Sequence, residues 1–330
     1  MLRALALAEQ GRYSVSPNPM VGCVIVQNGR VIGEGWHRRA GEPHAEVDAL
    51  RNCTDDPRGA TMYVTLEPCA HHGRTPPCAD ALIAAGLARV VIAMTDPHSV
   101  VNGRGIDMLR AAGIIVETGV CEEAARKLNE KFVHSVTQGL PFVLLKAGMT
   151  LDGKLATVTG ESRWITSPAA RERSLALREE YDAILVGGGT VTADDPQLTR
   201  RLGWNQSISP WTRVVLDRDR AVQPHARVLA DGARTILYQD DLPLIEVLRD
   251  LHRRGVQSIL VEGGSLVHSA FIREHLWQKM ILFVAPAVVG GGDAPSIFSG
   301  DPVARLTDAY RFRFDRVEVV GADLMITAYP

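Results

Sequence analysis

The sequence predicts two α/β domains in one chain. Its 330 residues exceed the roughly 100 to 200 residues of a typical domain. Strand-like and helix-like segments alternate in both halves, and the segment Gln138-Gly139-Leu140-Pro141 interrupts the chain between them. We therefore expect one domain over residues 1–140 and a second over residues 141–330.

The first half begins with the pattern of a β-hairpin. Apolar stretches at 21–26 and 31–36 flank Asn28-Gly29, a dipeptide favoured in two-residue hairpin turns. The segments that follow predict helices at 44–51, 79–85, 105–112 and 122–137, and strands at 61–66, 89–94 and 114–117. This order is typical of an α/β sandwich.

The second half alternates more regularly. Strands are expected at 142–146, 183–186, 213–216, 235–238, 258–261 and 279–284, and helices at 168–180, 244–253 and 266–274. Such alternation predicts a mainly parallel sheet covered by helices.

Composition and charge narrow the class of protein. Lys and Arg number 36 and Asp and Glu number 38, which leaves a formal net charge of -2. No global basic field is therefore present to attract nucleic acid or an anionic bilayer. The longest apolar runs reach about half of the ~20 residues that a membrane span needs. A hydrophobic share of 46% is typical of globular domains.

The N-terminal segment and the cysteines indicate the cytoplasm. Residues 1–10 are typical of an amphipathic helix rather than a signal peptide, because no small-residue cleavage site follows the short apolar stretch. The five cysteines are too few and too scattered for a disulfide framework. We expect a cytoplasmic protein without membrane or nucleic-acid partners.

One histidine and two cysteines of the first half have the residue types of a zinc site. His44 stands at a predicted helix start, Cys69 after a predicted strand and Cys78 at the next helix. Three such ligands leave the fourth tetrahedral position open to water, as in catalytic zinc sites. Zinc lowers the pKa of bound water to about 7. Glu46 lies two residues after His44 and can carry a proton from water to a leaving amine.

This pattern is close to that of zinc deaminases, which carry His-x-Glu followed by Pro-Cys-x-x-Cys. Here eight residues rather than two separate the cysteines, so a loop at 70–77 lies beside the metal. In that loop His71 and His72 either compete as ligands or face substrate or solvent. We interpret the remaining cysteines as structural, namely Cys23, Cys53 and Cys121.

Three segments of the first half carry longer motifs. They are 16–24 (SPNPMVGCV), 41–46 (GEPHAE) and 67–78, which begins EPC and ends GRTPPC. These segments resemble the deaminase half of the bifunctional riboflavin-biosynthesis deaminase/reductase family, in which a long inter-cysteine loop is usual. The resemblance implies a cytidine-deaminase-like α/β/α sandwich. It also implies loss of the 2-amino group of 2,5-diamino-6-(5-phosphoribosylamino)pyrimidin-4(3H)-one as ammonia.

The same resemblance implies roles for single residues. The zinc ligands are His44, Cys69 and Cys78. Glu46 is the catalytic proton shuttle. The positions that match substrate contacts are Asn18, His37 and Arg74. A guanidinium such as that of Arg74 is suited to grip the ribose phosphate.

The second half contains three glycine clusters at predicted strand ends, at 187–190, 263–265 and 290–292. Glycine lets backbone N–H groups approach phosphates, and the second cluster leads into a helix whose N-terminus favours anions. None of them matches G-x-G-x-x-G, and a tight turn is the alternative interpretation of each.

Four motifs of the second half carry a further resemblance. They are 145–146 with 151–154 (LK, LDGK), 160–167 (GESRWITS), 193–199 (ADDPQLT) and 261–264 (VEGG). They are similar to the reductase half of the same family. That similarity implies a dihydrofolate-reductase-like α/β domain that uses NADPH to reduce the ribosyl chain to ribityl.

Hydride transfer needs an acid or cation for the charge that develops on the heteroatom. We expect Asp194 and Lys146 to do this catalytic work and Glu262 to orient substrate, the alternatives being a turn-capping Asp and a solvated Lys. By resemblance, the other substrate contacts are Ser162, Arg178, Leu198 and Arg201, although Arg200 competes with Arg201 for the phosphate. By resemblance, NADP contacts are Trp164, Thr190, Asp194, Gly264, Ser265, Leu266, Val267, His268, Ser269 and Ala270. Arg218 is a further expected NADP contact, because it follows a predicted strand.

Two other functions are alternatives to a bifunctional enzyme. A nucleic-acid editing deaminase should show a basic stripe and stacking aromatics, whereas the charge is near zero and aromatic residues make up 5%. The second half is alternatively an idle nucleotide-binding or oligomerisation module. The resemblance also implies a homo-oligomer, either a dimer or a tetramer.

Overall fold

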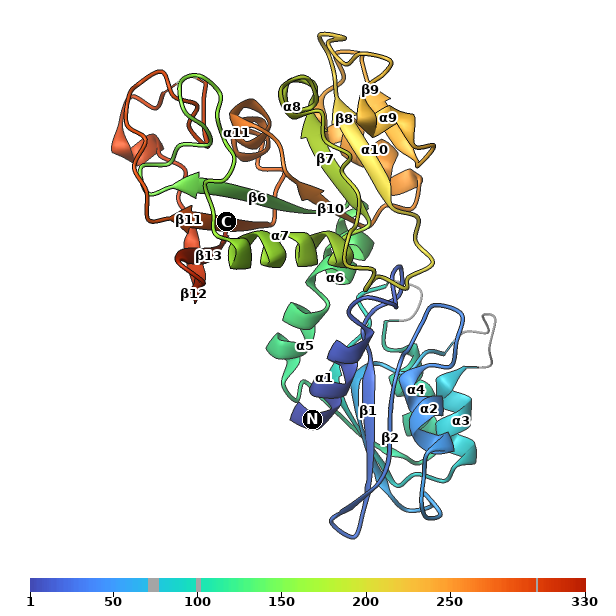
Figure 1. The fold of residues 1–330 in the computed structure, drawn as a ribbon. Coiled ribbons are helices and arrows are strands. Elements are labelled where there is room, and N and C mark those ends of the chain that lie inside the picture. The colour runs from blue at the N-terminus through green and yellow to red at the C-terminus, as the bar shows by residue number, and fades with distance from the viewer. Residues whose placement is uncertain (71–76, 99–101, 301) are drawn as a thin grey trace. The chain divides into compact units, whose positions relative to one another are not determined.

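The computed structural model describes residues 1–70, 77–98, 102–300 and 302–330. The chain divides into two compact units (Figure 1). Unit 1 holds Met1–Gly139 together with Trp204–Ser209, and unit 2 holds Leu140–Gly203 and Pro210–Pro330. The short segment Trp204–Ser209 belongs to unit 1 because Trp204 packs edge-on against Tyr13, whose carbonyl accepts a hydrogen bond from the Gln206 N–H at 2.6 Å.

Unit 1 is built on a five-stranded sheet of order β2-β1-β3-β4-β5. The strands are β1 (Gly22–Gln27), β2 (Arg30–Trp36), β3 (Thr61–Leu66), β4 (Arg89–Met94) and β5 (Ile115–Thr118). β1 runs antiparallel to β2 and β3, whereas β3, β4 and β5 are parallel. The predicted hairpin is confirmed, with positive φ angles at Asn28 and Gly29 in its turn.

Helices cover both faces of this sheet (Figure 1). They are α1 (Leu2–Ala8), α2 (Ala45–Arg51), α3 (Cys78–Ala84), α4 (Arg104–Ala111), α5 (Glu122–Leu128) and α6 (Glu130–Gln138), with a 3-10 turn at Glu9–Gly11. Two glycines allow the close approach. A Cβ at Gly22 would lie 2.0 Å from the Ala4 carbonyl oxygen of α1, and one at Gly35 would lie 2.3 Å from the Ala49 nitrogen of α2.

The polar helix expected at 122–137 is two helices, α5 and α6, which meet at Asn129. The Asn129 side chain is buried and exchanges two hydrogen bonds with the backbone of Met20, accepting from its N–H at 2.8 Å and donating to its carbonyl at 2.9 Å. This contact spans 109 positions of sequence. A local pattern therefore carries no sign of the break.

Unit 2 contains an eight-stranded sheet of order β12-β13-β11-β6-β10-β7-β8-β9. The strands are β6 (Phe142–Thr150), β7 (Ala183–Gly187), β8 (Thr212–Leu216), β9 (Thr235–Tyr238), β10 (Ser258–Val261), β11 (Lys279–Ala285), β12 (Arg313–Val320) and β13 (Asp323–Tyr329). All pairs from β11 to β9 are parallel, and β13 and β12 add an antiparallel edge. The expected mainly parallel sheet is confirmed.

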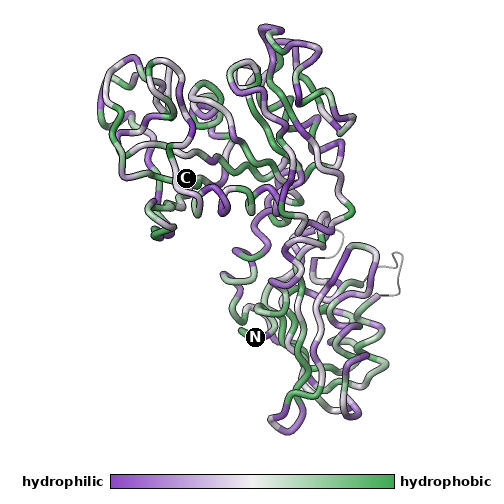
Figure 2. The backbone as a smooth tube through the Cα atoms, viewed as in Figure 1, coloured by the Kyte–Doolittle hydropathy of each residue, from purple (hydrophilic) through white to green (hydrophobic). Residues whose placement is uncertain are grey.

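The helices of unit 2 lie on both faces of the sheet. They are α7 (Pro168–Glu180), α8 (Gly188–Asp194), α9 (Arg227–Ala230), α10 (Leu244–Arg253) and α11 (Ser265–Arg273), with a 3-10 turn at Leu306–Asp308. Alternate residues of β6 serve the two cores: Leu144 packs with α7, whereas Leu145 packs with α10 and α11. In Figure 2 the hydrophobic residues of unit 2 are concentrated along its strands.

Helices α8 and α9 and the hairpin of β12 and β13 differ from the expected elements of unit 2. Helix α8 begins inside the glycine cluster at 187–190, where a phosphate-binding loop or a tight turn was expected. The hairpin of β12 and β13 has no counterpart in the predicted elements. As an edge strand, β12 mixes charged and exposed apolar residues rather than forming an apolar run. Among the described residues, no helix has the length and apolarity to cross a membrane.

Candidate functional sites

The three predicted zinc ligands of unit 1 converge in space. His44 is the residue before α2, Cys69 follows β3, and Cys78 opens α3. His44 Nδ1 lies 3.2 Å from Cys78 Sγ and 3.6 Å from Cys69 Sγ, and the three ligand atoms all lie within 4.8 Å of one another. This is the only cluster of three or more metal-ligating side chains found among the described residues.

The donor set fits zinc. Both cysteines are free thiols, and an imidazole with two sulfurs is the ligand chemistry of a catalytic zinc with one open position. The Cys69 Sγ also accepts a hydrogen bond from the Cys78 backbone N–H at 3.2 Å. Hydrogen bonds from Cys78 and His44 lower the pKa of Cys69 to about 4, which favours the thiolate that a metal requires.

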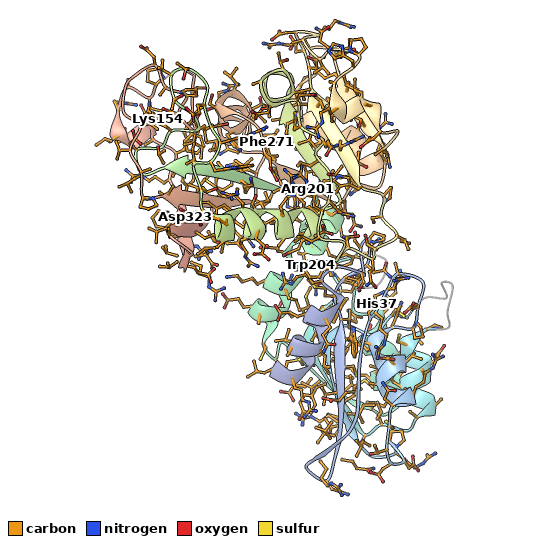
Figure 3. All side chains as sticks on the ribbon, in the orientation of Figure 1. His37, Lys154, Arg201, Trp204, Phe271 and Asp323 are labelled. Atoms are coloured by element: carbon orange, nitrogen blue, oxygen red, sulfur yellow. The ribbon has the colours of Figure 1, made fainter. Side chains whose placement is uncertain are left out.

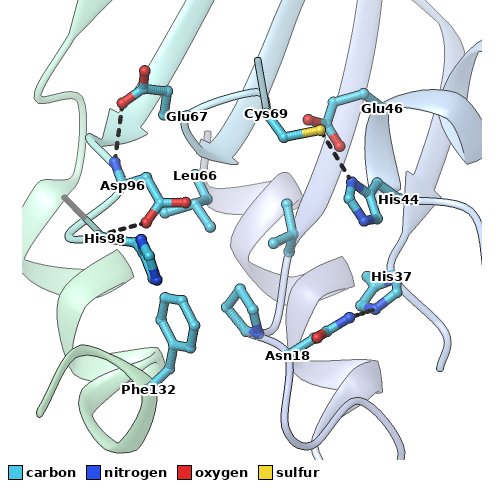
Figure 4. A pocket seen from close by; sticks show the side chains of 12 residues that line it. Asn18, His37, His44, Glu46, Leu66, Glu67, Cys69, Asp96, His98 and Phe132 are labelled. Atoms are coloured by element: carbon cyan, nitrogen blue, oxygen red, sulfur yellow. Dashed lines mark hydrogen bonds between the residues drawn. The ribbon is translucent and has the colours of Figure 1, made fainter. Parts of the chain in front are cut away.

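Glu46 faces the same site from the first turn of α2. It is buried, with 3% of its surface exposed, and burial raises its pKa. Glu46, His44 and Cys69 line a cavity of about 310 Å³ (Figure 4). A buried carboxylate with a raised pKa beside the metal-ligand cluster is suited to take up and release a proton.

Two more predicted residues line this cavity. Asn18 Nδ2 lies 3.0 Å from His37 Nε2 (Figure 4). His37 Nδ1 lies 3.1 Å from the Pro43 carbonyl oxygen. His37 is 2% exposed, and burial lowers its pKa, so it is a neutral partner for a heterocycle. The predicted contact Arg74 lies outside the described residues, as do His71 and His72.

The opposite wall of the cavity holds residues that the sequence analysis did not single out, namely Glu67, Asp96, His98 and Phe132 (Figure 4). Buried Glu67 accepts hydrogen bonds from the backbone N–H groups of Asp96, Gly103, Gly105 and Ile106. It thereby ties the strand end before Cys69 to the loop that carries Asp96. The sequence feature that could have indicated a role for Glu67 is its place in the Glu-Pro-Cys motif.

In unit 2 the structure brings three predicted residues together. Lys146 Nζ lies 3.2 Å from Glu262 Oε2, and Arg178 donates two hydrogen bonds to the Glu262 carboxylate at 3.0 and 2.9 Å. All three side chains are largely buried. Burial alone would raise the pKa of Glu262, but Arg178 and Lys146 lower it to about 2. Glu262 is therefore a fixed anion near neutral pH.

Strand register explains this cluster. Leu145 of β6 pairs with Val261 of β10, so the residues that follow them, Lys146 and Glu262, emerge side by side. The predicted partner Asp194 is not part of the cluster within the described structure. It ends α8, and its carboxylate lies 4.0 Å from the Arg163 guanidinium.

A larger cavity of about 600 Å³ opens at the first two glycine clusters. The predicted NADP contacts that line it are Thr190, Arg218, Gly264, Ser265, Leu266, Val267 and Ala270. His268 and Ser269 do not line it. The His268 side chain on α11 is buried with 1% exposure, and the Ser269 hydroxyl accepts a hydrogen bond from the Ser299 N–H. Trp164 is exposed and is also absent from the lining.

The third glycine cluster, at 290–292, lies against the carboxylate of Asp152. The Asp152 carboxylate accepts hydrogen bonds from the N–H groups of Val289 and Gly290, at 3.3 and 2.8 Å. A hydrogen bond from the Thr150 hydroxyl, followed by these backbone bonds, lowers the pKa of Asp152 to about 2. This glycine cluster therefore binds a carboxylate of its own chain rather than a ligand phosphate.

The structure separates the two neighbouring arginines. Arg200 donates to the carbonyls of Arg178 and Tyr181 and stacks on Trp211, so its guanidinium belongs to the scaffold. Arg201 is exposed (Figure 3). Of the other predicted substrate contacts, Ser162 is half-buried in the loop before α7, and the Leu198 side chain is 3% exposed.

The fold and the two sites define a class of protein, a two-domain α/β enzyme with a deaminase unit followed by a reductase unit. The family model described as the cytidine and deoxycytidylate deaminase zinc-binding region matches residues 1–94. The RibD C-terminal domain model matches residues 141–326. The chain belongs to the family of the riboflavin biosynthesis protein RibD.

Full-length relatives carry this assignment. RibD of Escherichia coli is 41% identical over 359 residues, covering 99% of this chain and 97% of the relative. RibD of Mycobacterium tuberculosis is 43% identical, covering 98% and 96%. The solved structure of Acinetobacter baumannii RibD, form 1, is 40% identical with a TM-score of 0.91, covering 100% and 97%.

A second solved structure has a more explicit description. It is a diaminohydroxyphosphoribosylaminopyrimidine deaminase/5-amino-6-(5-phosphoribosylamino)uracil reductase from Thermotoga maritima, 39% identical with a TM-score of 0.89, covering 100% of this chain and 97% of that chain. The predicted family and the predicted α/β fold, a deaminase domain followed by a RibD reductase domain, are confirmed.

Proposed function

We propose that this chain performs two successive steps of riboflavin biosynthesis. Unit 1 hydrolyses the 2-amino group of 2,5-diamino-6-(5-phosphoribosylamino)pyrimidin-4(3H)-one, giving 5-amino-6-(5-phosphoribosylamino)uracil and ammonia. Unit 2 reduces the ribosyl chain of that product to ribityl with NADPH. The observation that carries the proposal is the convergence of His44, Cys69 and Cys78 beside buried Glu46 in a chain of this family. The proposed domain limits are 1–140 and 141–330.

In the deamination, one water adds to the carbon that bears the amino group, and the carbon–nitrogen bond then breaks. His44, Cys69 and Cys78 would hold zinc, which when bound supplies hydroxide near neutral pH by lowering the pKa of water. Glu46 takes the proton from water and delivers it to the departing amine, so that ammonia leaves. The Asn18–His37 pair is the hydrogen-bonding edge that we propose for the pyrimidine, and Arg74 is proposed to bind the phosphate.

In the reduction, a hydride adds to C1 of the open-chain sugar, and a proton reaches the heteroatom. When bound in the cavity at the glycine clusters, NADPH supplies the hydride. Lys146 is the cation proposed to stabilise the developing charge, and Glu262 keeps it in place through their 3.2 Å contact. Asp194 is the proposed second polar group of this reaction, placed at the end of α8.

The remaining contacts of the reductase site are proposals of the same kind. We propose Ser162, Arg178, Leu198 and Arg201 for the substrate, and Trp164, Thr190 and residues 264–270 for NADPH, with His268 and Ser269 acting from behind the cavity wall. Arg218 is the proposed cofactor contact at the far strand end. Its guanidinium lies 3.6 Å from both Asp219 and Asp241, so a cofactor phosphate must compete with these carboxylates.

The assembly and the compartment are also proposed. The cytoplasm is the compartment that we propose. A homo-oligomer, dimer or tetramer, is consistent with the exposed apolar side chains of the edge strand β12, which include Phe314, Val317 and Val319. Light scattering on the purified chain tests this: a monomeric mass at micromolar concentration would contradict it.

The function is tested by product analysis. Purified zinc-loaded protein is incubated with the diaminopyrimidine ribonucleotide, with and without NADPH, and the products are identified by mass spectrometry. We expect the ribosylaminouracil without NADPH and its ribityl derivative with NADPH. Unchanged substrate in both reactions would contradict the proposed function.

A further inference from the structure

The segment of unit 2 that carries Leu198 and Arg201 is held by its backbone in an unusual way. Three successive carbonyl oxygens each accept a hydrogen bond from a different side chain. Gln197 accepts from Arg213 Nη1 at 3.0 Å, Leu198 from Trp211 Nε1 at 2.8 Å, and Thr199 from Arg178 Nη1 at 3.2 Å. We call residues 197–202 the carbonyl-clamped segment.

The same segment is held at its N–H groups. Glu179, which is fully buried on α7, accepts hydrogen bonds from the N–H groups of Arg201 at 3.2 Å and Leu202 at 3.0 Å. Leu198 itself has a φ of 52°, a left-handed conformation that an L-residue rarely adopts. Such a conformation persists only where the surroundings over-determine it, and here the clamping side chains do so.

These contacts leave few groups of Leu198 for a ligand. Its side chain is 3% exposed and its carbonyl is used by Trp211. Within the described residues no hydrogen bond to its N–H is found. The backbone N–H is thus the group that Leu198 can offer to a substrate. Its direction depends on the peptide geometry that the clamp sets.

Trp211 contacts the segment twice. Its indole N–H donates to Leu198, and the face of its ring carries the Arg200 guanidinium, with Cζ 4.5 Å from the ring centroid. Trp211 directly precedes β8, so it is fixed to the sheet. No other described side chain both bonds the carbonyl of Leu198 and stacks on a residue of the segment.

We propose that Trp211 is a positioning residue of the reductase, which fixes the carbonyl-clamped segment so that the Leu198 N–H and the Arg201 guanidinium meet the pyrimidine ribonucleotide together. This proposal rests on the reductase function proposed above. Trp211 acts through the segment and touches neither substrate nor NADPH. Its loss should therefore weaken substrate binding without changing cofactor binding.

The test compares Trp211→Phe with Trp211→Leu in the full-length enzyme. The Phe variant keeps an aromatic face for Arg200 but removes the N–H donor, whereas the Leu variant removes both. Steady-state NADPH oxidation is followed with the ribosylaminouracil as substrate. We expect the KM for this substrate to rise about 5-fold in Trp211→Phe and further in Trp211→Leu, because one neutral hydrogen bond is lost in the first. The kcat and the KM for NADPH should stay within about 2-fold of wild type.

Trp277→Phe is the matched control. Trp277 is buried in the same unit and packs against Phe312, away from the segment. It should lower the melting temperature as Trp211→Phe does while leaving both KM values unchanged. If Trp211→Phe does not fold, Glu179→Gln, which weakens the grip on the N–H side, is measured with the same expectation.

The outcomes separate the two proposals. A wild-type enzyme that does not oxidise NADPH with this substrate overturns the reductase function itself. An active wild type with an unchanged substrate KM in the folded Trp211→Phe variant overturns the role of Trp211 alone. An equal rise in both KM values, or a fall in kcat only, also overturns it.

Discussion

The two sites of this chain are built in different ways. In unit 1, the reactive groups are brought together by a short stretch of chain, with His44 and Glu46 at one helix start and the two cysteines around one loop. In unit 2, Lys146 lies within β6, Arg178 lies on α7, and Glu262 follows the end of β10. These residues are separated by up to 116 positions and are joined by ion pairs. A metal site is determined by ligand types, whereas a hydride-transfer site is determined by register and backbone placement.

The largest expected effect is the loss of deamination by unit 1 while reduction by unit 2 stays unchanged. Glu46→Gln removes the proton shuttle, so ammonia release should fall about 10³-fold. Reduction of supplied ribosylaminouracil should stay unchanged, and metal analysis should still show one zinc per chain. Glu42→Gln, an exposed change in the preceding loop, is the control. Deamination by Glu46→Gln at a near-normal rate would refute the assignment.

The reverse experiment impairs reduction by unit 2 and leaves deamination by unit 1 unchanged. Glu262→Gln leaves Lys146 and Arg178 without the carboxylate that holds them, so the kcat/KM of reduction should fall about 10²-fold through misplacement of the cation. Ammonia release by the same preparation should be normal. Glu246→Gln breaks a surface ion pair with Arg249 and should affect neither activity. Loss of both activities in Glu262→Gln would show that the two sites do not fail independently.

A smaller effect concerns stability. Burial lowers the pKa of His268 to about 4, below the usual value near 6.5 of an unfolded chain. Between these values the unfolded state binds the extra proton, so the stability due to neutral His268 is present above about pH 6.5 and is lost as the pH falls towards 4. Between pH 7 and pH 5 the loss should be about 2 kcal/mol.

Denaturant unfolding of unit 2 at pH 7 and pH 5 measures this loss. In His268→Phe the pH dependence should shrink by the same amount, because no proton can bind there. An undiminished pH dependence in the variant would mean that other groups cause it. His252→Phe, which changes a half-exposed histidine of α10, is the comparison variant.

The features that could be predicted from the sequence are those that depend on the identity of nearby residues. The hairpin turn at Asn28-Gly29 and the approach of His44, Cys69 and Cys78 were predictable, because turn type and metal chemistry each restrict residue identity locally. Strand alternation predicted the parallel core of unit 2 for a similar reason. These features need no knowledge of distant contacts.

The features that could not be predicted depend on long-range partners. Asn129 interrupts a helix because its amide meets Met20 across the fold. The Asp152 carboxylate accepts a hydrogen bond from the N–H of Gly290 in the third glycine cluster. The Trp211 indole donates to the carbonyl of Leu198, which lies 13 positions earlier in the chain. Asn129 and Trp211 lie in no motif, and the LDGK motif around Asp152 does not indicate which backbone groups its carboxylate binds. Only the packed structure shows which backbone group each one satisfies.

The central claim is that unit 1 makes the substrate of unit 2. Its most direct test follows NADPH oxidation by one preparation, with zinc present and after its removal by chelation, using either the diaminopyrimidine ribonucleotide or the deaminated uracil ribonucleotide. We predict that chelation abolishes oxidation with the first substrate and leaves it unchanged with the second. Oxidation of NADPH with the diaminopyrimidine in the chelated enzyme, without ammonia release, would contradict the account.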